Sequence, residues 1–175
     1  MTRSNARELA VHLIFEQGFS EASADELLEG ALKRSVFETL EGEPLYAEFP
    51  NQAQRAYIEQ LVRGVEAHRA ELDGYIEQYA IGWRLSRLPR TVVAILRVCM
   101  YEILYMQDVP NAAAINEAVE MTKHYEESEL SSFVNGILGS FVRSEPLPRA
   151  ETEAMPADAF DPEPVPEEPE TPEEA

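Results

Sequence analysis

The side chains that could perform acid–base, nucleophilic or metal chemistry are scattered along this 175-residue chain. Its three histidines, His12, His68 and His124, fall in three separate helical stretches and lack the spacing of a metal-binding helix. Cys99 is the only cysteine and stands among apolar residues, where a small buried side chain is expected. The sequence contains no phosphate-binding glycine loop and no serine nucleophile motif. We therefore expect a protein without catalytic activity, metal or cofactor.

The run SSFVNGILGSF at residues 131–141 combines a turn signal with a helical pattern. Asn-Gly between apolar residues is typical of a β-hairpin, yet the apolar positions repeat as on one face of a helix. They are Phe133, Val134, Ile137, Leu138 and Phe141. A glycine inside a helix costs about 1 kcal/mol relative to alanine. We therefore expect a helix in which Gly136 and Gly139 let another helix approach closely. Asn135 would hydrogen-bond a neighbouring backbone or Asn116.

Helical periodicity extends through almost all of residues 1–143, and no run alternates as a strand would. Ser23 with Glu26 forms a capping-box pattern, and Asn51 is a good N-cap. Gly64 and Gly74 are the positions at which a long third helix could bend or divide. The expected fold is all-α, with main helices at about 4–18, 23–40, 51–79 and 89–106, a fifth over 115–122 and a sixth from 128.

The formal net charge of −19 is divided between two regions. Residues 144–175 hold 11 acids, one base and eight prolines, with little apolar surface to bury. We expect a helical domain at 1–143 and a disordered, acidic Pro/Glu-rich tail at 144–175. The domain itself has 22 acids and 13 bases, so its net charge opposes RNA binding. Any RNA contact must be local or shared with a basic partner.

The N-terminal stretch MTRSNARELAVHLIF has no uninterrupted apolar run long enough for a signal sequence. No segment approaches the roughly 20 apolar residues that a membrane-spanning helix needs. The single cysteine fits a reducing compartment, where disulfides are rare. We expect a soluble cytoplasmic protein that makes no membrane contact.

Several short motifs in the C-terminal half occur in an order typical of one family. They are ILR at 95–97, YE at 101–102, DVP at 108–110, AINEAVE at 114–120 and FVNGIL at 133–138. The first helix, ARELAVHLIF, agrees more loosely. Over residues 3–142 the chain resembles the NusB family of transcription antitermination factors. The resemblance implies a compact fold of two packed helical bundles and a non-enzymatic, RNA-binding adaptor.

The resemblance also implies partners and an RNA surface. Family members pair with NusE, a small-subunit ribosomal protein, and the heterodimer binds the boxA element of nascent RNA. This supports antitermination, chiefly in ribosomal RNA operons, together with RNA polymerase and other Nus factors. Arginines would contact phosphates and an exposed aromatic ring would stack on an unpaired base. By position, the implied RNA-binding residues are Arg3, Arg7, Tyr79, Glu129, Ser132 and Phe133.

Two of these residues have further consequences. An RNA-facing Arg7 lies on the surface, so Arg7→Ala should leave thermal stability nearly unchanged. Phe133 shares its spacing with Ile137 and Phe141, which makes core packing an equal interpretation of that ring. A large drop in melting temperature for Phe133→Ala would favour the core interpretation.

The chain also departs from the family pattern. Its N-terminus offers only Arg3 and Arg7, and Ser132 stands where a basic residue often precedes the phenylalanine. Val92-Val93 replaces a common charged pair and could form an apolar contact within one chain or in a homodimer. Because each lost phosphate contact weakens binding, we expect low RNA affinity without NusE.

Two alternatives remain beside an antitermination factor. A helical protein-interaction module of the same fold that has largely lost RNA binding would fit the acidic balance and the few N-terminal arginines. The RNA-binding domain of a ribosomal RNA cytosine methyltransferase is disfavoured, since no Rossmann-like catalytic pattern follows residue 143.

Overall fold

The computed structural model describes residues 1–148, and within them all regular structure is helical. The α-helices are α1 (Arg3–Gln17), α2 (Ala24–Ala31), α3 (Arg34–Thr39), α4 (Gln52–Ala67), α5 (Arg69–Tyr79), α6 (Arg90–Tyr105), α7 (Asn111–Tyr125) and α8 (Ser128–Ser144). Two short 3-10 helices, η1 (Pro44–Tyr46) and η2 (Leu85–Arg87), lie in the connections. The all-α prediction is confirmed. From residue 149 onward the predicted disordered tail lies outside the described residues.

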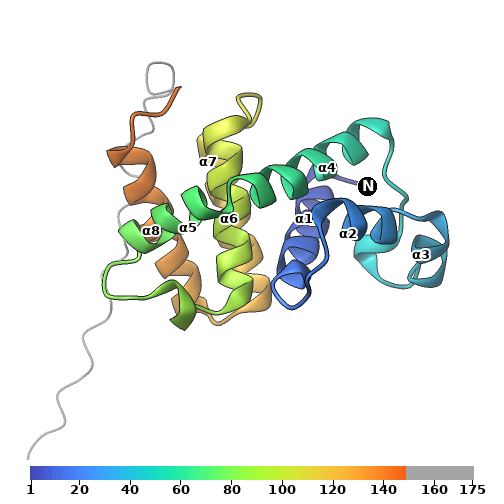
Figure 1. Cartoon of the computed structure of the whole chain (residues 1–175), viewed down its shortest axis with the longest axis horizontal. Helices are drawn as coiled ribbons and strands as arrows, with labels where there is room; N and C mark the ends of the chain where they lie inside the picture. The colour runs from blue at the N-terminus through green and yellow to red at the C-terminus, as the bar shows by residue number, and fades with distance from the viewer. Residues whose placement is uncertain (149–175) are drawn as a thin grey trace, which may run out of the picture.

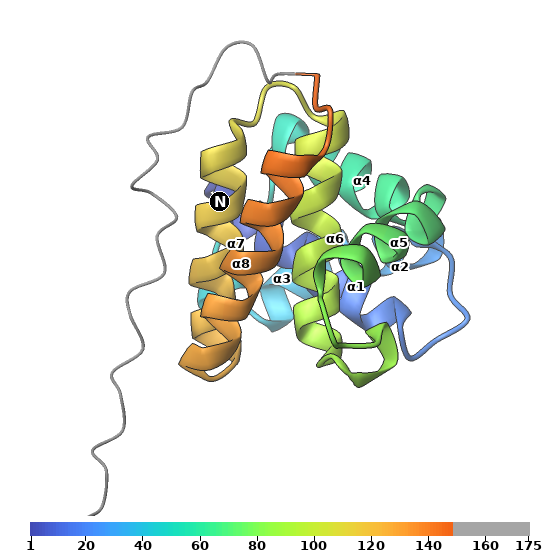
Figure 2. The same cartoon turned by 90° about the vertical axis from the view of Figure 1, so that its left-hand side faces the viewer.

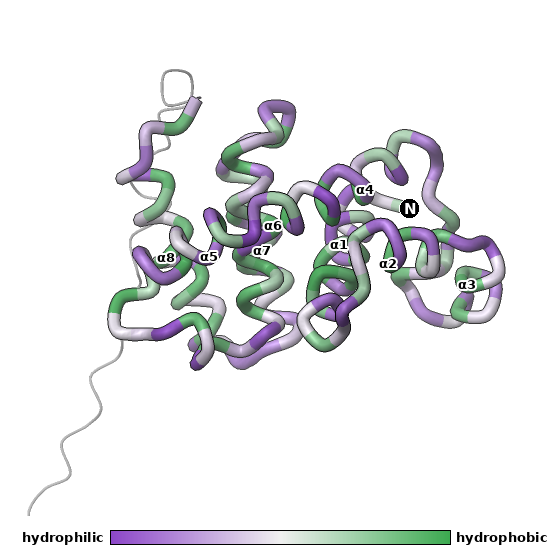
Figure 3. The backbone as a smooth tube through the Cα atoms, in the orientation of Figure 1, coloured by the Kyte–Doolittle hydropathy of each residue, from purple (hydrophilic) through white to green (hydrophobic). Residues whose placement is uncertain are grey.

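The helices form two packed groups, as expected (Figure 1). In the first group α1 packs on α2 and α4, and in the second α6, α7 and α8 lie side by side with α5 against α6 and α8 (Figure 2). Contacts of α1 and α4 with α6 join the two groups, so α6 is the central helix. Apolar and hydrophilic residues alternate along the helices at short intervals (Figure 3). None of the helices in residues 1–148 is long and apolar enough to cross a membrane.

Two helices expected to be continuous are each divided. The 23–40 stretch forms α2 and α3, which are separated by Leu32 and Lys33. The 51–79 stretch divides into α4 and α5 at His68, and not at Gly64 or Gly74. The two capping residues are confirmed, because Ser23 and Asn51 each form a capping box with the residue three positions on.

Gly64 has a packing role in place of the expected bend. A Cβ atom built at Gly64 would lie 2.0 Å from Cζ of Tyr101 on α6, so only glycine lets these two helices approach so closely. At Gly74 a Cβ would meet nothing within 4 Å. The close approach of α4 to the central helix therefore depends on one glycine.

The Asn-Gly motif lies inside α8, so the helical interpretation is confirmed and the hairpin is excluded. The proposed packing role of Gly136 is wrong, because this residue is exposed and a Cβ there would meet nothing within 4 Å. Asn116 is exposed and Asn135 half-buried, and neither amide forms a hydrogen bond with any part of residues 1–148. The expected Asn135–Asn116 bond is therefore also wrong. Gly139 is buried, and its packing role stays a prediction.

The packed body continues a few residues beyond position 143. The hydroxyl of Tyr79 donates a hydrogen bond to Glu145, just after α8. Leu147 is buried in the hydrophobic core with 7% of its surface exposed. Residues up to 147 therefore belong to the folded domain.

Candidate nucleic-acid interface

The residues expected to bind RNA lie in separate places, toward opposite ends of α6. Arg3 donates to Asp108, which follows the C-terminal end of α6, at 2.9 Å. Phe133 contacts Trp83, which lies in the segment leading into the N-terminal end of α6. The 16 residues of α6 span about 24 Å. Arg3 and Phe133 therefore do not form one compact site.

Arg7 is part of a buried ion pair, which contradicts its expected role as a phosphate contact. Its side chain donates to both carboxylate oxygens of Glu102, with Nε 2.9 Å from Oε2 and Nη2 3.0 Å from Oε1. Its Nη1 lies 3.2 Å from Glu117, and the Tyr57 hydroxyl also donates to Glu102. Arg7 is 5% exposed and Glu102 is fully buried. A phosphate could engage Arg7 only by leaving the buried Glu102 uncompensated.

The electrostatics of this cluster keep it in one charge state. Burial lowers the pKa of Arg7, but its hydrogen bonds and ion pair with Glu102 outweigh burial and raise that pKa overall. Burial, and then the charge of Glu102, raise the pKa of Tyr57. Both groups therefore stay protonated at physiological pH, and the cluster holds α1, α4 and α6 together.

Arg3 is more accessible than Arg7, with 48% of its side chain exposed. Its guanidinium lies 4.7 Å from the centre of the Tyr57 ring, and the hydrogen bond to Asp108 raises its pKa. The same side chain lines a cavity of about 480 Å³ together with Gln54 and Gln60. A phosphate at Arg3 would have to compete with Asp108.

The start of α8 presents the other expected residues. Glu129 and Ser132 are exposed, and their RNA contacts stay predictions. Phe133 is half-buried: it packs partly against the core, and its ring meets Trp83 edge to face at a centroid distance of 6.0 Å. Trp83 is 53% exposed and the neighbouring Ile81 is 88% exposed. Phe133 thus packs partly in the core and is partly accessible at the surface.

Tyr79 is engaged within the molecule. The hydrogen bond that its hydroxyl donates to Glu145 raises its pKa, and its ring meets Phe141 at a centroid distance of 5.8 Å. These contacts give Tyr79 a role in joining α5 to α8. An additional role in RNA binding stays a prediction.

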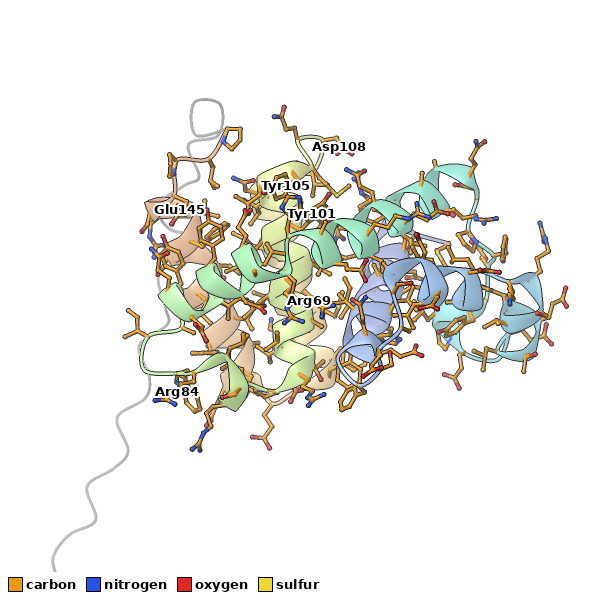
Figure 4. The ribbon with its side chains drawn as sticks, in the orientation of Figure 1. Arg69, Arg84, Tyr101, Tyr105, Asp108 and Glu145 are labelled. Atoms are coloured by element: carbon orange, nitrogen blue, oxygen red, sulfur yellow. The ribbon has the colours of Figure 1, made fainter. Side chains whose placement is uncertain are left out.

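A basic segment beside Trp83 was missed in the sequence analysis. Residues 78–101 contain no Asp or Glu, although the chain as a whole carries a net charge of −19. Arg84 and Arg87 are exposed, and neither forms an ion pair or a side-chain hydrogen bond with the described part of the chain. Figure 4 shows Arg84 at the edge of the molecule, pointing away from the helices. The sequence itself could have indicated this segment, because regularly spaced arginines follow the only tryptophan within a run that contains no acids.

The structure supports one of the two interpretations of Val92-Val93, a contact within one chain. Val92 and Val93 are buried, so they pack within the monomer and form no exposed patch. Exposed aromatic surface is found instead at Phe15 and at Phe19, whose ring lies 4.2 Å from the guanidinium of Arg90. Beside Phe15 a groove of about 680 Å³ runs between α1 and α2, lined by apolar residues and by two acids. The lining includes Val11, Leu27, Tyr46, Glu16 and Glu26.

The fold and these surfaces define a helical binding protein with a basic, aromatic edge and a separate acid-lined apolar groove. Within residues 1–148 no group of His, Cys, Asp or Glu side chains is arranged to hold a metal ion. The model of the NusB family matches residues 4–143. The chain therefore belongs to the NusB family.

Individual relatives agree with this assignment. The chain is 41% identical over 144 residues to the transcription antitermination protein NusB of Symbiobacterium thermophilum, covering 82% of this chain and 90% of that protein. It is 39% identical over 143 residues to NusB of Acetivibrio thermocellus, with the same coverage. The solved structure of T. maritima NusB shares the fold, with a TM-score of 0.70 and 24% identity over 83% of this chain and 93% of that one.

Proposed function

We propose that this protein is a transcription antitermination factor: a non-enzymatic adaptor that acts in the cytoplasm. Together with NusE it binds the boxA element of nascent ribosomal RNA transcripts and contacts RNA polymerase and other Nus factors. The observation that carries the proposal is the identity of 39–41%, over nearly the whole folded domain, to relatives named transcription antitermination protein NusB.

The aromatic edge at the start of α8 supports the RNA part of the proposal. Single-stranded RNA is recognised through unstacked bases that pack on aromatic rings. Phe133 and Trp83 present such rings at the molecular surface, beside exposed arginines.

The charge distribution supports the need for a basic partner. Arg7 neutralises Glu102 inside the protein, and Arg3 is paired with Asp108. The N-terminal helix therefore offers little free positive charge to RNA. NusE, as a basic ribosomal protein, would supply that charge, and the groove containing Glu16 and Glu26 is suited to a partner with cationic and apolar side chains.

One observation favours a second function, a protein-interaction module that has largely lost RNA binding. The N-terminal arginines expected to hold phosphates are committed to acids of the same chain. This alternative predicts that the protein still binds NusE but that the complex does not distinguish boxA from other RNA.

The test is RNA binding by the purified protein with and without NusE, measured by fluorescence anisotropy of labelled boxA RNA and of a scrambled RNA of equal composition. The proposal predicts weak binding by the protein alone and tight, boxA-selective binding by the complex. Equal affinities of the complex for the two RNAs would refute the antitermination proposal and favour the second function.

A further inference from the structure

The 81–90 segment carries unpaired positive charge, whereas the arginines of the first helix are paired with acids. Four arginines occur in the acid-free run of residues 78–101, while the remainder of the chain carries all the acids. Arg97 is paired with Asp73, and Arg90 donates to the carbonyl of Gly18 at 2.7 Å. Arg84 and Arg87 have no such partner within residues 1–148. An anion meets these two guanidinium groups without displacing a carboxylate.

The local backbone brings the two arginines close together. Arg84 precedes η2 and Arg87 is its last residue. The backbone N–H of Arg87 donates to the carbonyl of Arg84 at 2.9 Å, and such a turn keeps the two Cα atoms within about 7 Å of each other. Gly82, with φ of +84°, makes the turn into this segment, and Leu88, which is 6% exposed, anchors its end in the core. The segment therefore presents two exposed arginine side chains from an ordered backbone.

An aromatic surface adjoins these cations. Trp83 lies immediately before Arg84 and contacts Phe133 on α8. Trp83 remains half exposed despite that contact, and Ile81 is almost fully exposed. Stacking of bases on aromatic rings, combined with a basic track for the backbone, is how proteins bind single-stranded nucleic acid.

We propose that the 81–90 segment holds the RNA strand in this protein: Arg84 and Arg87 neutralise two phosphates, and Trp83 stacks on an unpaired base beside Phe133. This inference rests on the proposed function and deepens it. It places the strand at the N-terminal end of α6, whereas Arg7, in the first helix, is occupied by Glu102. The ligand is a single strand, because a base inside a duplex cannot stack on a side chain.

The charge of the segment favours RNA over a protein as the ligand. The exposed apolar residues, Ile81 and Trp83, would suit either. Two neighbouring guanidinium groups without carboxylate partners, in a protein with a net charge of −19, fit a regularly spaced polyanion best. Because the apolar residues would also suit a protein, the experiment must be able to detect binding of a protein at this segment.

Trp83 allows a direct test, because it is the only tryptophan and its fluorescence reports this site alone within the full chain. With a NusE that lacks tryptophan or carries Trp→Phe replacements, we expect boxA RNA to quench the emission of the complex. Trp83→Ala should weaken RNA binding by about 5- to 150-fold, the range for loss of one stacked base. Arg84→Ala with Arg87→Ala should reduce the slope of log K against log salt by about 1.4, since each single-strand phosphate contact contributes about 0.7.

Arg34→Ala with Arg55→Ala is the matched control. Both arginines are exposed and lack ion pairs within the described residues, but they lie over Phe49 beside α3 and α4, away from η2. This double variant should keep the affinity and the salt slope of the unmodified complex. None of these four arginines is buried, so both double variants should retain the melting temperature of the unmodified protein.

The outcomes separate this inference from the proposed function. Selective boxA binding that is unaffected at Arg84, Arg87 and Trp83, without quenching, would overturn the inference and leave antitermination in place. Salt-dependent quenching by both boxA and scrambled RNA with equal affinity would support the RNA track and overturn the proposed function. A change in Trp83 emission on adding NusE alone, with none on adding RNA, would show a protein contact and overturn the inference.

Discussion

At the scale of single residues, the first helix shows how a pattern shared with a family can mislead about a side chain. Arg7 was expected on the surface, yet it lies with Glu102 and Tyr57 at the centre of the molecule. Nothing in the local sequence distinguishes a buried arginine from an exposed one. The distinction depends on Glu102, which is 95 residues away in the sequence.

Arg7→Ala should lower the free energy of unfolding by about 3–5 kcal/mol, because it leaves the fully buried Glu102 without a counter-charge. This reverses the expectation drawn from an RNA-facing Arg7. Urea denaturation measures the effect. Arg3→Ala, which breaks an exposed pair with Asp108, is the control and should cost less than about 1 kcal/mol.

A combined variant tests the physical reason. Arg7→Met together with Glu102→Gln removes both charges and keeps an acceptor for the Tyr57 hydroxyl. It should recover most of the stability lost in Arg7→Ala, since paired replacement of a buried ion pair is often neutral. A double variant as unstable as the single one would contradict the uncompensated-charge explanation.

His12 should make the stability depend on pH in a mildly acidic range. Burial lowers its pKa below 6.5, although the charge of Glu8 opposes the shift. Its Nε2 lies 2.7 Å from the hydroxyl of Tyr125. The unfolded chain therefore binds a proton at a higher pH than the folded chain does, so stability is complete above about pH 6.5 and falls as the pH drops below it.

Chemical denaturation between pH 5 and pH 7.5 checks this expectation. His12→Gln should flatten the dependence of stability on pH in that window. His68→Gln, at the junction of α4 and α5, is the control and should leave the dependence due to His12 in place. An unchanged profile in His12→Gln would exclude His12 as its source.

At the scale of helices, signals carried by near neighbours in the sequence gave correct predictions. The capping residues Ser23 and Asn51 and the apolar period of α8 depend on residues within a few positions, and the structure confirms them. The division at His68 and the role of Gly64 could not be predicted in the same way. The role of Gly64 depends on Tyr101 of α6, which lies against α4, and His68 meets the ring of the same tyrosine at a centroid distance of 5.9 Å.

The two glycines Gly64 and Gly136 should respond oppositely to alanine. Gly64→Ala places a methyl group on the Tyr101 ring and should destabilise the protein by about 1–3 kcal/mol. Gly136→Ala adds a methyl group in open space within α8 and should stabilise it by about 0.5–1 kcal/mol. Thermal unfolding of both variants tests the assignment, and a destabilising Gly136→Ala would revive the close-packing role for this residue.

At the scale of the whole molecule, the pairing of arginines with acids determines which positive charges are available to bind RNA. A local or shared RNA contact stays a prediction, but the N-terminal arginines expected to make it are paired with acids of the same chain. The fold leaves Arg84 and Arg87 unpaired in the 81–90 segment, whereas Arg7 of α1 is used in internal packing. Free charge could not be assigned from composition alone, since pairing depends on the assembled helices.

Removing residues 149–175 should strengthen RNA binding at low salt. The segment holds 10 acids and one base, so its loss removes long-range repulsion of the phosphates. The gain should disappear above about 0.5 M salt, where the charges are screened. The truncation must keep Leu147, which is buried, and should then leave the melting temperature unchanged. An affinity independent of the segment at every salt concentration would contradict this expectation.

The central claim is that this NusB-family protein binds single-stranded boxA RNA along the 81–90 segment and the start of α8. The most direct measurement is photo-crosslinking of 4-thiouridine-labelled boxA RNA to the complex with NusE, followed by mass-spectrometric mapping of the linked residues. We predict cross-links at Trp83 and Phe133 that scrambled RNA does not produce at the same concentration. Cross-links confined to the first helix, or equal yields from both RNAs, would contradict the claim.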